Sequence, residues 1–122
     1  MNPKENKVIG IVGSRRRAEG SDLASCAKAF LDIYKKGDTI VSGGCPKGGD
    51  HFAELIAKKW EIPIKIHTAE WKKYGRSAGI IRNTYIAEDA DVLLAIVASD
   101  RTGGTEDTIR KATKLKKEII LV

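Results

Sequence analysis

Short apolar runs rich in valine and isoleucine alternate along this chain with segments whose apolar residues recur every three or four positions. Runs such as 8–12, 39–42 and 91–97 are typical of strands that are buried on both faces. Helices are expected to begin near residues 21, 49 and 76, and a fourth helix is expected after Gly103 and Gly104. This alternation predicts an α/β fold in which helices cover both faces of a parallel sheet.

The order of the strands can be predicted as well. Two further strand-like segments, 63–67 and 118–122, bring the expected strands to five. Right-handed crossovers between parallel strands limit the topology, and among the possible orders we prefer a five-stranded parallel sheet with the strand order 3-2-1-4-5. Ser21 is expected to cap the first helix and Gly37 to end it. The length of 122 residues predicts one domain that spans residues 1–122.

Composition disfavours some classes of protein and favours others. No apolar run approaches the roughly 20 residues that span a bilayer, and residues 1–7 are polar, so we expect a cytoplasmic protein with no membrane partner. Cys26 and Cys45 lack the spacing of a metal or redox site, so no metal is expected. The net charge of +6 favours anionic partners, among which nucleic acid is the less favoured one.

Three loops of unusual composition follow the first, second and fourth expected strands. They span residues 13–17, 42–50 and 99–108, and each combines glycine with hydroxyl and basic side chains. In open parallel sheets, ligands bind beyond the carboxyl ends of the strands, at the point where the strand order reverses. That point lies between the first and fourth strands, so the three loops are expected to surround one ligand.

Each loop offers groups that suit an anion. Gly13 allows a tight turn beside the hydroxyl of Ser14 and the guanidinium of Arg15. Four glycines crowd residues 43–49, which favours a close approach of backbone to ligand and makes this loop the expected main phosphate site. The candidate ligand-binding residues of the three loops are Gly13, Ser14, Arg15, Ser42, Gly43, Gly44, Lys47, Gly48, Asp50, Thr102, Gly103, Gly104 and Thr105.

Structural roles are the alternative for several of these residues. The segment 13–17 can be an ordinary strand-to-helix turn beside a solvated run of charge. Asp50 can cap a helix or hold a ribose hydroxyl, and Glu106 and Asp107 can cap the last helix. Cys45 can act as a nucleophile only with a base beside it, and the spacing identifies none.

The chain resembles a known family over nearly its whole length. The similar stretches are 10–15, 42–50, 71–83 and 103–105, and the third has the pattern W-x-x-Y-G-x-x-A-G-x-x-R-N. In these stretches the chain is similar to the SLOG superfamily, and most of all to its stand-alone YspA-like group. The resemblance implies a Rossmann-like three-layer sandwich that binds nucleotides or nucleotide-derived ligands.

The resemblance also assigns roles within the third stretch. It implies that Arg82 and Asn83 reach the ligand, with Arg82 as a phosphate or ribose contact. Trp71 and Tyr74 are expected either to stack on a base or to pack under the loop that precedes Gly75. A homodimer is a further expectation from the family.

Three functions follow from the branches of this superfamily. The LOG-like branch cleaves the N-glycosidic bond of nucleoside monophosphates with the glutamate of a G-G-x-G-T-x-x-E motif. Thr108 stands at that position here, which leaves Glu106 as a weak catalytic candidate. The DprA-like branch binds single-stranded DNA, and the G-T-x-x-T form of this chain is nearer to that branch. That branch uses additional surface that this chain lacks. We therefore expect binding or sensing of a nucleotide-derived phosphorylated ligand, with no certain cofactor, and keep N-glycosidic hydrolysis and single-stranded nucleic-acid binding as alternatives.

Overall fold

Five parallel strands form one sheet in the order β3-β2-β1-β4-β5, as the sequence predicts. The computed structural model describes residues 6–122. β1 and β4 carry apolar residues or glycine at every position, rather than apolar residues at alternate ones, as expected of buried strands in the middle of the sheet. The strands are β1 (Val8–Gly13), β2 (Thr39–Ser42), β3 (Ile64–Ile66), β4 (Val92–Ile96) and β5 (Glu118–Leu121).

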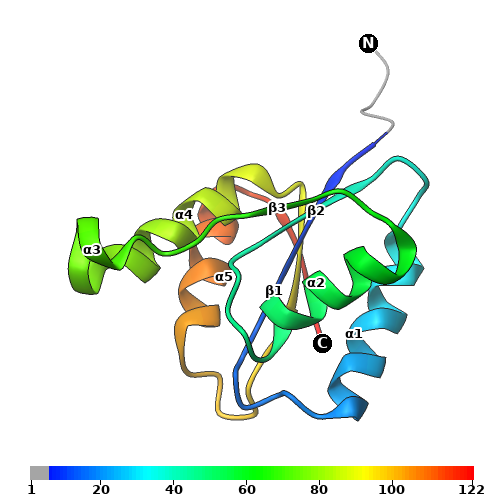
Figure 1. The fold of residues 1–122 in the computed structure, drawn as a ribbon, viewed down its shortest axis with the longest axis horizontal. Helices are drawn as coiled ribbons and strands as arrows, with labels where there is room; N and C mark the ends of the chain where they lie inside the picture. The colour runs from blue at the N-terminus through cyan, green and yellow to red at the C-terminus, as the bar shows by residue number, and fades with distance from the viewer. Residues whose placement is uncertain (1–5) are drawn as a thin grey trace.

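Helices cover both faces of this sheet, with α1 and α2 on one side and α4 and α5 on the other (Figure 1). A short helix, α3, and a 3₁₀ turn, η1, precede α4 and were not expected, because four residues are too few to show a helical period. No helix of the described residues is long and apolar enough to cross a membrane. The helical segments are α1 (Gly20–Ile33), α2 (Gly49–Trp60), α3 (Trp71–Tyr74), η1 (Gly75–Ser77), α4 (Ala78–Asp89) and α5 (Gly104–Lys114).

The sheet separates two hydrophobic cores, and β4 contributes to both of them. Leu94 and Ile96 pack with α1 and α2, whereas Leu93 and Ala95 pack with α4 and α5. Successive side chains of a strand point to opposite faces, so a strand in this position must be apolar throughout. Every residue of β4 is buried.

The start and end of α1 correct two predictions. The helix begins at Gly20, and the backbone N–H of Glu19 donates to Asp22 Oδ2 at 3.1 Å. Ser21 is exposed and does not cap the helix, because it lies within the first turn rather than ahead of it. Gly37 lies beyond the helix end at Ile33, in the turn before β2, where its φ of 100° suits glycine.

The pairing of β1 with β4 brings the first and third glycine-containing loops together. Gly13 is in register with Ile96, and the next backbone N–H, that of Ser14, donates to the Ile96 carbonyl at 2.9 Å. Both strands therefore end at the same level. The loops that follow them diverge from this point, which is where the strand order reverses.

Candidate ligand-binding site

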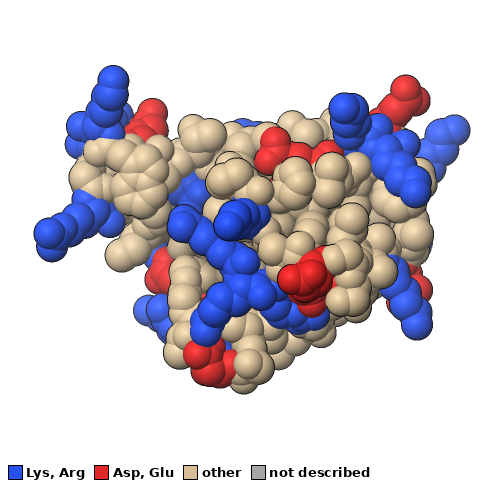
Figure 2. Space-filling model, turned by 60° about the horizontal axis from the view of Figure 1, so that its bottom comes forward, with Lys and Arg blue, Asp and Glu red and all other residues tan. Residues whose placement is uncertain are grey.

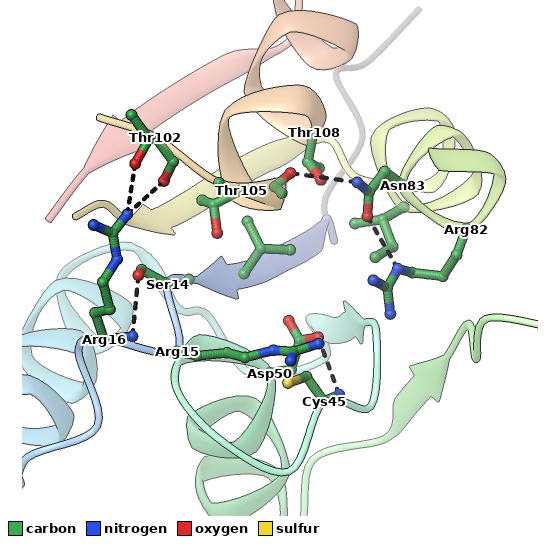
Figure 3. A pocket seen from close by; sticks show the side chains of 15 residues that line it. Ser14, Arg15, Arg16, Cys45, Asp50, Arg82, Asn83, Thr102, Thr105 and Thr108 are labelled. Atoms are coloured by element: carbon green, nitrogen blue, oxygen red, sulfur yellow. Dashed lines mark hydrogen bonds between the residues drawn. The ribbon is translucent and has the colours of Figure 1, made fainter. Parts of the chain in front are cut away.

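A cavity of about 390 Å³ opens where the carboxyl ends of β1 and β4 diverge (Figure 3). Its lining comes from the loop after β1, the loop after β2, the starts of α2 and α5, and the inner side of α4. Lys and Arg side chains gather near the middle of this end of the molecule, with fewer acidic ones between them (Figure 2). The geometry and the charge both suit an anionic small molecule.

The structure brings most of the predicted site residues to this cavity. Ser42 and Gly43 are buried behind its lining, Gly44 and Gly48 do not line it, and Lys47 is exposed elsewhere on the loop. The predicted residues that line the cavity are Gly13, Ser14, Arg15, Asp50, Arg82, Asn83, Thr102, Gly103, Gly104 and Thr105.

Gly48 and Gly49 of the second loop have a structural explanation that involves no ligand. A Cβ on Gly49 would lie 2.3 Å from the Gly13 nitrogen, and a Cβ on Gly48 would lie 2.3 Å from the Ser14 carbonyl oxygen. Gly48 also has a φ of 75°. These glycines therefore let α2 start directly against the end of β1. The close backbone approach is between two parts of the chain, and it needs no ligand to explain it.

Asp50 is the acidic side chain of the cavity wall. It is 7% exposed, and it accepts a hydrogen bond from the Cys45 backbone N–H at 3.1 Å. Ser42 Oγ lies 3.2 Å from Asp50 Oδ1 and shares its one proton between this oxygen and the Ile11 carbonyl at 2.5 Å. Burial raises the pKa of its carboxyl group, and the Cys45 bond, the positive charge of Arg82 and the Ser42 bond offset only part of this rise. Asp50 lies in the first turn of α2, but its two bonds go to the preceding strand and loop rather than to the helix end.

Arg82 and Asn83 reach the cavity from α4 and connect it to the neighbouring loops. The Arg82 guanidinium donates from Nη1 to the Gly43 carbonyl and from Nε to Asn83 Oδ1, both at 3.0 Å. Asn83 Nδ2 donates to the Gly104 carbonyl at 3.3 Å and to Asp107 Oδ2 at 3.2 Å. These bonds hold α4 against the second loop on one side and the start of α5 on the other.

Neighbouring arginines of the first loop have different surroundings. Arg16 donates to Asp100 Oδ2 at 2.8 Å and to the backbone and side-chain oxygens of Thr102, which ties the first loop to the third. The Arg16 side chain holds the pKa of Asp100 at about 2. Arg15 lines the cavity and forms no ion pair with any described residue.

The start of α5 forms the far wall of the cavity. Thr108 is buried and lines the cavity at the position where the LOG-like motif has its glutamate. Glu106 does not line the cavity, and it forms a two-pronged pair with Arg101, at 2.8 Å to Nε and 3.0 Å to Nη2. Glu106, the catalytic candidate, is therefore paired with Arg101 outside the cavity.

Some residues of the site and its surroundings were missed or misjudged. Trp71 is 58% exposed and lies against Gly79 on α4, and neither Trp71 nor Tyr74 lines the cavity. The expected base-stacking platform is therefore not part of it. The lining residues that sequence reasoning did not select are Val12, Arg16, Cys45, Ile86 and Thr108. Helical spacing places Thr108 above Gly104 and Thr105 and could have identified it.

The polar groups of the cavity are those of an anion-binding site. Within residues 6–122, no group of three or more His, Cys, Asp or Glu side chains could hold a metal ion. The cavity instead combines guanidinium groups, threonine and serine hydroxyls, and one buried carboxylate. Such a set can bind a phosphate and orient a polar group next to it.

Comparison with solved structures supports the architecture. A molybdenum cofactor binding protein from the phototrophic bacterium Rippkaea orientalis superimposes with a TM-score of 0.74 and 24% identity, covering 98% of this chain and 77% of that one. The molybdenum cofactor carrier protein of Chlamydomonas reinhardtii gives a TM-score of 0.67 and 21% identity, covering 96% and 76%. The fold is Rossmann-like. At this level of identity, the likeness establishes the fold alone.

Sequence comparison adds one relative of similar length. The Gene 61 protein of Mycobacterium phage D29 is 29% identical over an alignment of 110 residues, and the match covers 85% of this chain and 86% of that protein. No protein-family model matches the chain.

Proposed function

We propose that the cavity binds a phosphorylated, nucleotide-like small molecule and that the chain is a binding or sensing module. Residues 1–122 then constitute one nucleotide-binding domain of the SLOG type, nearest its YspA-like group. The cofactor-binding and carrier functions named for the two solved structures support a role in holding such a ligand rather than converting it.

The observation that carries this proposal is the pairing state of the arginines. Arg16, Arg17 and Arg101 each form an ion pair with a carboxylate at 2.8–2.9 Å. Arg15 and Arg82 have no such partner among the described residues, and both line the cavity. Guanidinium groups recognise phosphate through paired hydrogen bonds, so two of them on separate walls favour an anion between them.

Thermal unfolding with added ligands tests the proposal. AMP, GMP and inorganic pyrophosphate are titrated against the protein. A ligand that binds only the folded state adds about 2.7 kcal/mol at 100 times its Kd, or roughly 10 °C in Tm for a chain of this size. Arg15→Ala is expected to lose most of this shift. Arg76→Ala, an exposed arginine of η1 away from the cavity, is the matched control and is expected to keep it. Absence of any shift across this panel contradicts the proposal.

Hydrolysis of an N-glycosidic bond is the second candidate, and one observation favours it. Asp50 places a carboxylate in the cavity wall, and chemistry that passes through an oxocarbenium-like state needs a carboxylate beside the sugar. Incubation with nucleoside monophosphates, followed by chromatography of free base, tests this activity. Base release that Asp50→Asn abolishes and Glu106→Ala leaves intact supports it. Release no faster than in protein-free buffer rules it out for these substrates.

A further inference from the structure

Two aspartates of the described chain are buried, and their charges are balanced differently. Asp38 is 1% exposed and accepts a hydrogen bond from the Lys7 ammonium at 2.6 Å. Asp50 is 7% exposed and forms no ion pair with any described residue. Its two hydrogen-bond donors, a serine hydroxyl and a backbone amide, are neutral. Because burial of a charge without a cation costs free energy, the position of Asp50 requires an explanation.

The carboxylate of Asp50 can accept more hydrogen bonds than the protein supplies. An ionised carboxylate offers about four acceptor sites, and Asp50 receives one bond on each oxygen. Arg82 is the nearby cation, but its two hydrogen bonds go to the Gly43 carbonyl and to Asn83. The free acceptor sites of Asp50 are therefore available to whatever occupies the cavity.

The same cavity also holds free donor capacity. Arg82 uses two of its five N–H groups within the described chain, and Arg15 uses none. Figure 3 shows Arg15, Asp50 and Arg82 around one opening, on three different segments of the chain. The guanidinium groups of Arg15 and Arg82 thus favour a negatively charged group of a ligand. The carboxylate of Asp50 repels such a group and favours hydrogen-bond donors.

We propose that Asp50 determines the specificity of the cavity, selecting ligands that carry hydrogen-bond donors next to their phosphate and discriminating against bare oxyanions. This inference rests on the proposed function and names the ligand class within it. A bare oxyanion would place its oxygens against the buried carboxylate with no proton between them. A phosphorylated ligand with hydroxyl or amino groups satisfies both walls at once. Ribose hydroxyls and the amino group of a base share this donor chemistry.

Calorimetric titration of the unmodified protein tests the inference and separates the two sources of donors. The probes are AMP and GMP, their 2′,3′-dideoxy forms, their deamino counterparts (purine riboside 5′-monophosphate and IMP) and inorganic pyrophosphate. Loss of a donor to a charged acceptor is expected to weaken binding roughly ten- to hundredfold. Weakening of the dideoxy forms assigns the donor to ribose, and weakening of the deamino forms assigns it to the base. Pyrophosphate is expected to bind most weakly.

Two outcomes of this titration overturn the inference. Equal affinity across the series, or binding of pyrophosphate alone, removes the specificity role of Asp50 while an anion-binding cavity stands. Binding of none of the probes contradicts the proposed function, and the inference falls with it.

A variant pair provides an independent readout. Asp50→Asn keeps the size of the side chain but removes the charge, so the ratio of nucleotide to pyrophosphate affinity is expected to fall at least tenfold. Glu54→Gln removes a charge from the same helix, one turn further on, at a residue that influences Asp50 electrostatically but does not line the cavity. It is expected to keep the ratio. A wild-type ratio in a folded Asp50→Asn overturns the inference, and if that variant does not fold, the titration of the unmodified protein decides.

Discussion

At the scale of single residues, the glycines of the second loop have a structural role that is separate from ligand binding. Gly49 has no room for a side chain, because a Cβ would lie 2.3 Å from the backbone of Val12 and Gly13. Backbone cannot move aside as a flexible side chain can. The position is therefore set by contact between α2 and β1.

Gly49→Ala is expected to lower the free energy of unfolding by about 3 kcal/mol, which is the upper part of the range for overpacked sites. Urea unfolding followed by circular dichroism measures the change. Gly20→Ala is the control, since nothing lies within 4 Å of the added Cβ, and it should change stability by less than about 0.5 kcal/mol. Equal effects of the two substitutions would contradict the close approach of α2 to β1.

Glycine also shows why part of the site could not be predicted from sequence. A glycine is needed wherever backbone meets backbone and wherever backbone meets a ligand, and composition cannot separate the two cases. Gly48 and Gly49 belong to the first case. The lining role of Cys45 depends on the path of the same loop, which no local pattern encodes.

At the scale of elements, helix starts combine local signals with neighbouring contacts. Asp22 accepts a hydrogen bond from the backbone N–H of Glu19, and its carboxylate also pairs with Arg17 at 2.9 Å. It therefore joins the start of α1 to the loop after β1. Ser21 has a better intrinsic preference for a cap than Glu19, which occupies the cap position, but Ser21 lies two residues too late in the chain.

Asp22→Ala is expected to lower the free energy of unfolding by about 1–2 kcal/mol, because the helix start loses its acceptor and Arg17 loses its partner. Thermal unfolding in low and in high salt measures the change, and salt should reduce it. Ser21→Ala, at an exposed position, is expected to have an effect below about 0.5 kcal/mol. A larger effect for Ser21→Ala would restore the original assignment of the cap.

The strands were easier to predict than these helix starts. The run 92–97 is apolar throughout, and only a strand buried on both faces needs that pattern at this length. The handedness of crossovers, which is a property of all chains, limits the possible strand orders, and the preferred one among them, 3-2-1-4-5, is confirmed. The cap of α1 and the short α3 depend on particular side-chain contacts and on tertiary context, so no general rule supplied them.

At the scale of the whole molecule, Asp38 connects segments that are distant in sequence. It accepts hydrogen bonds from the backbone and side chain of Lys7, just before β1, and from the backbone of Lys35, after α1. Burial raises the pKa of its carboxyl group, but the hydrogen bonds from Lys7 and Lys35 together lower this pKa by more. The net result is a pKa below the usual value. A carboxylate with a lowered pKa stabilises the folded state above its usual pKa of about 4, and this contribution is lost as the pH falls through the lowered value.

Asp38→Asn is therefore expected to destabilise the protein by about 2 kcal/mol at pH 7, less than for a fully buried ion pair because Lys7 is partly exposed. The difference from the wild type should shrink as the pH falls below about 4, where the carboxyl group of the unfolded chain takes up a proton, and should be smallest below the lowered pKa of the native carboxyl group. Melting temperatures measured from pH 7 to pH 2.5 test this. A difference that stays constant over the whole range would show that the charge of Asp38 contributes nothing.

The contact between α2 and β1 has a consequence for protein engineering. Gly48 and Gly49 pack backbone against backbone without lining the cavity, whereas the cavity walls include side chains from separate segments, such as Arg15 and Thr105. A library that aims at new ligands can therefore vary these wall positions freely. Substitutions at positions 48 and 49 would yield mostly unfolded variants. Keeping both glycines therefore raises the share of folded variants in such a library.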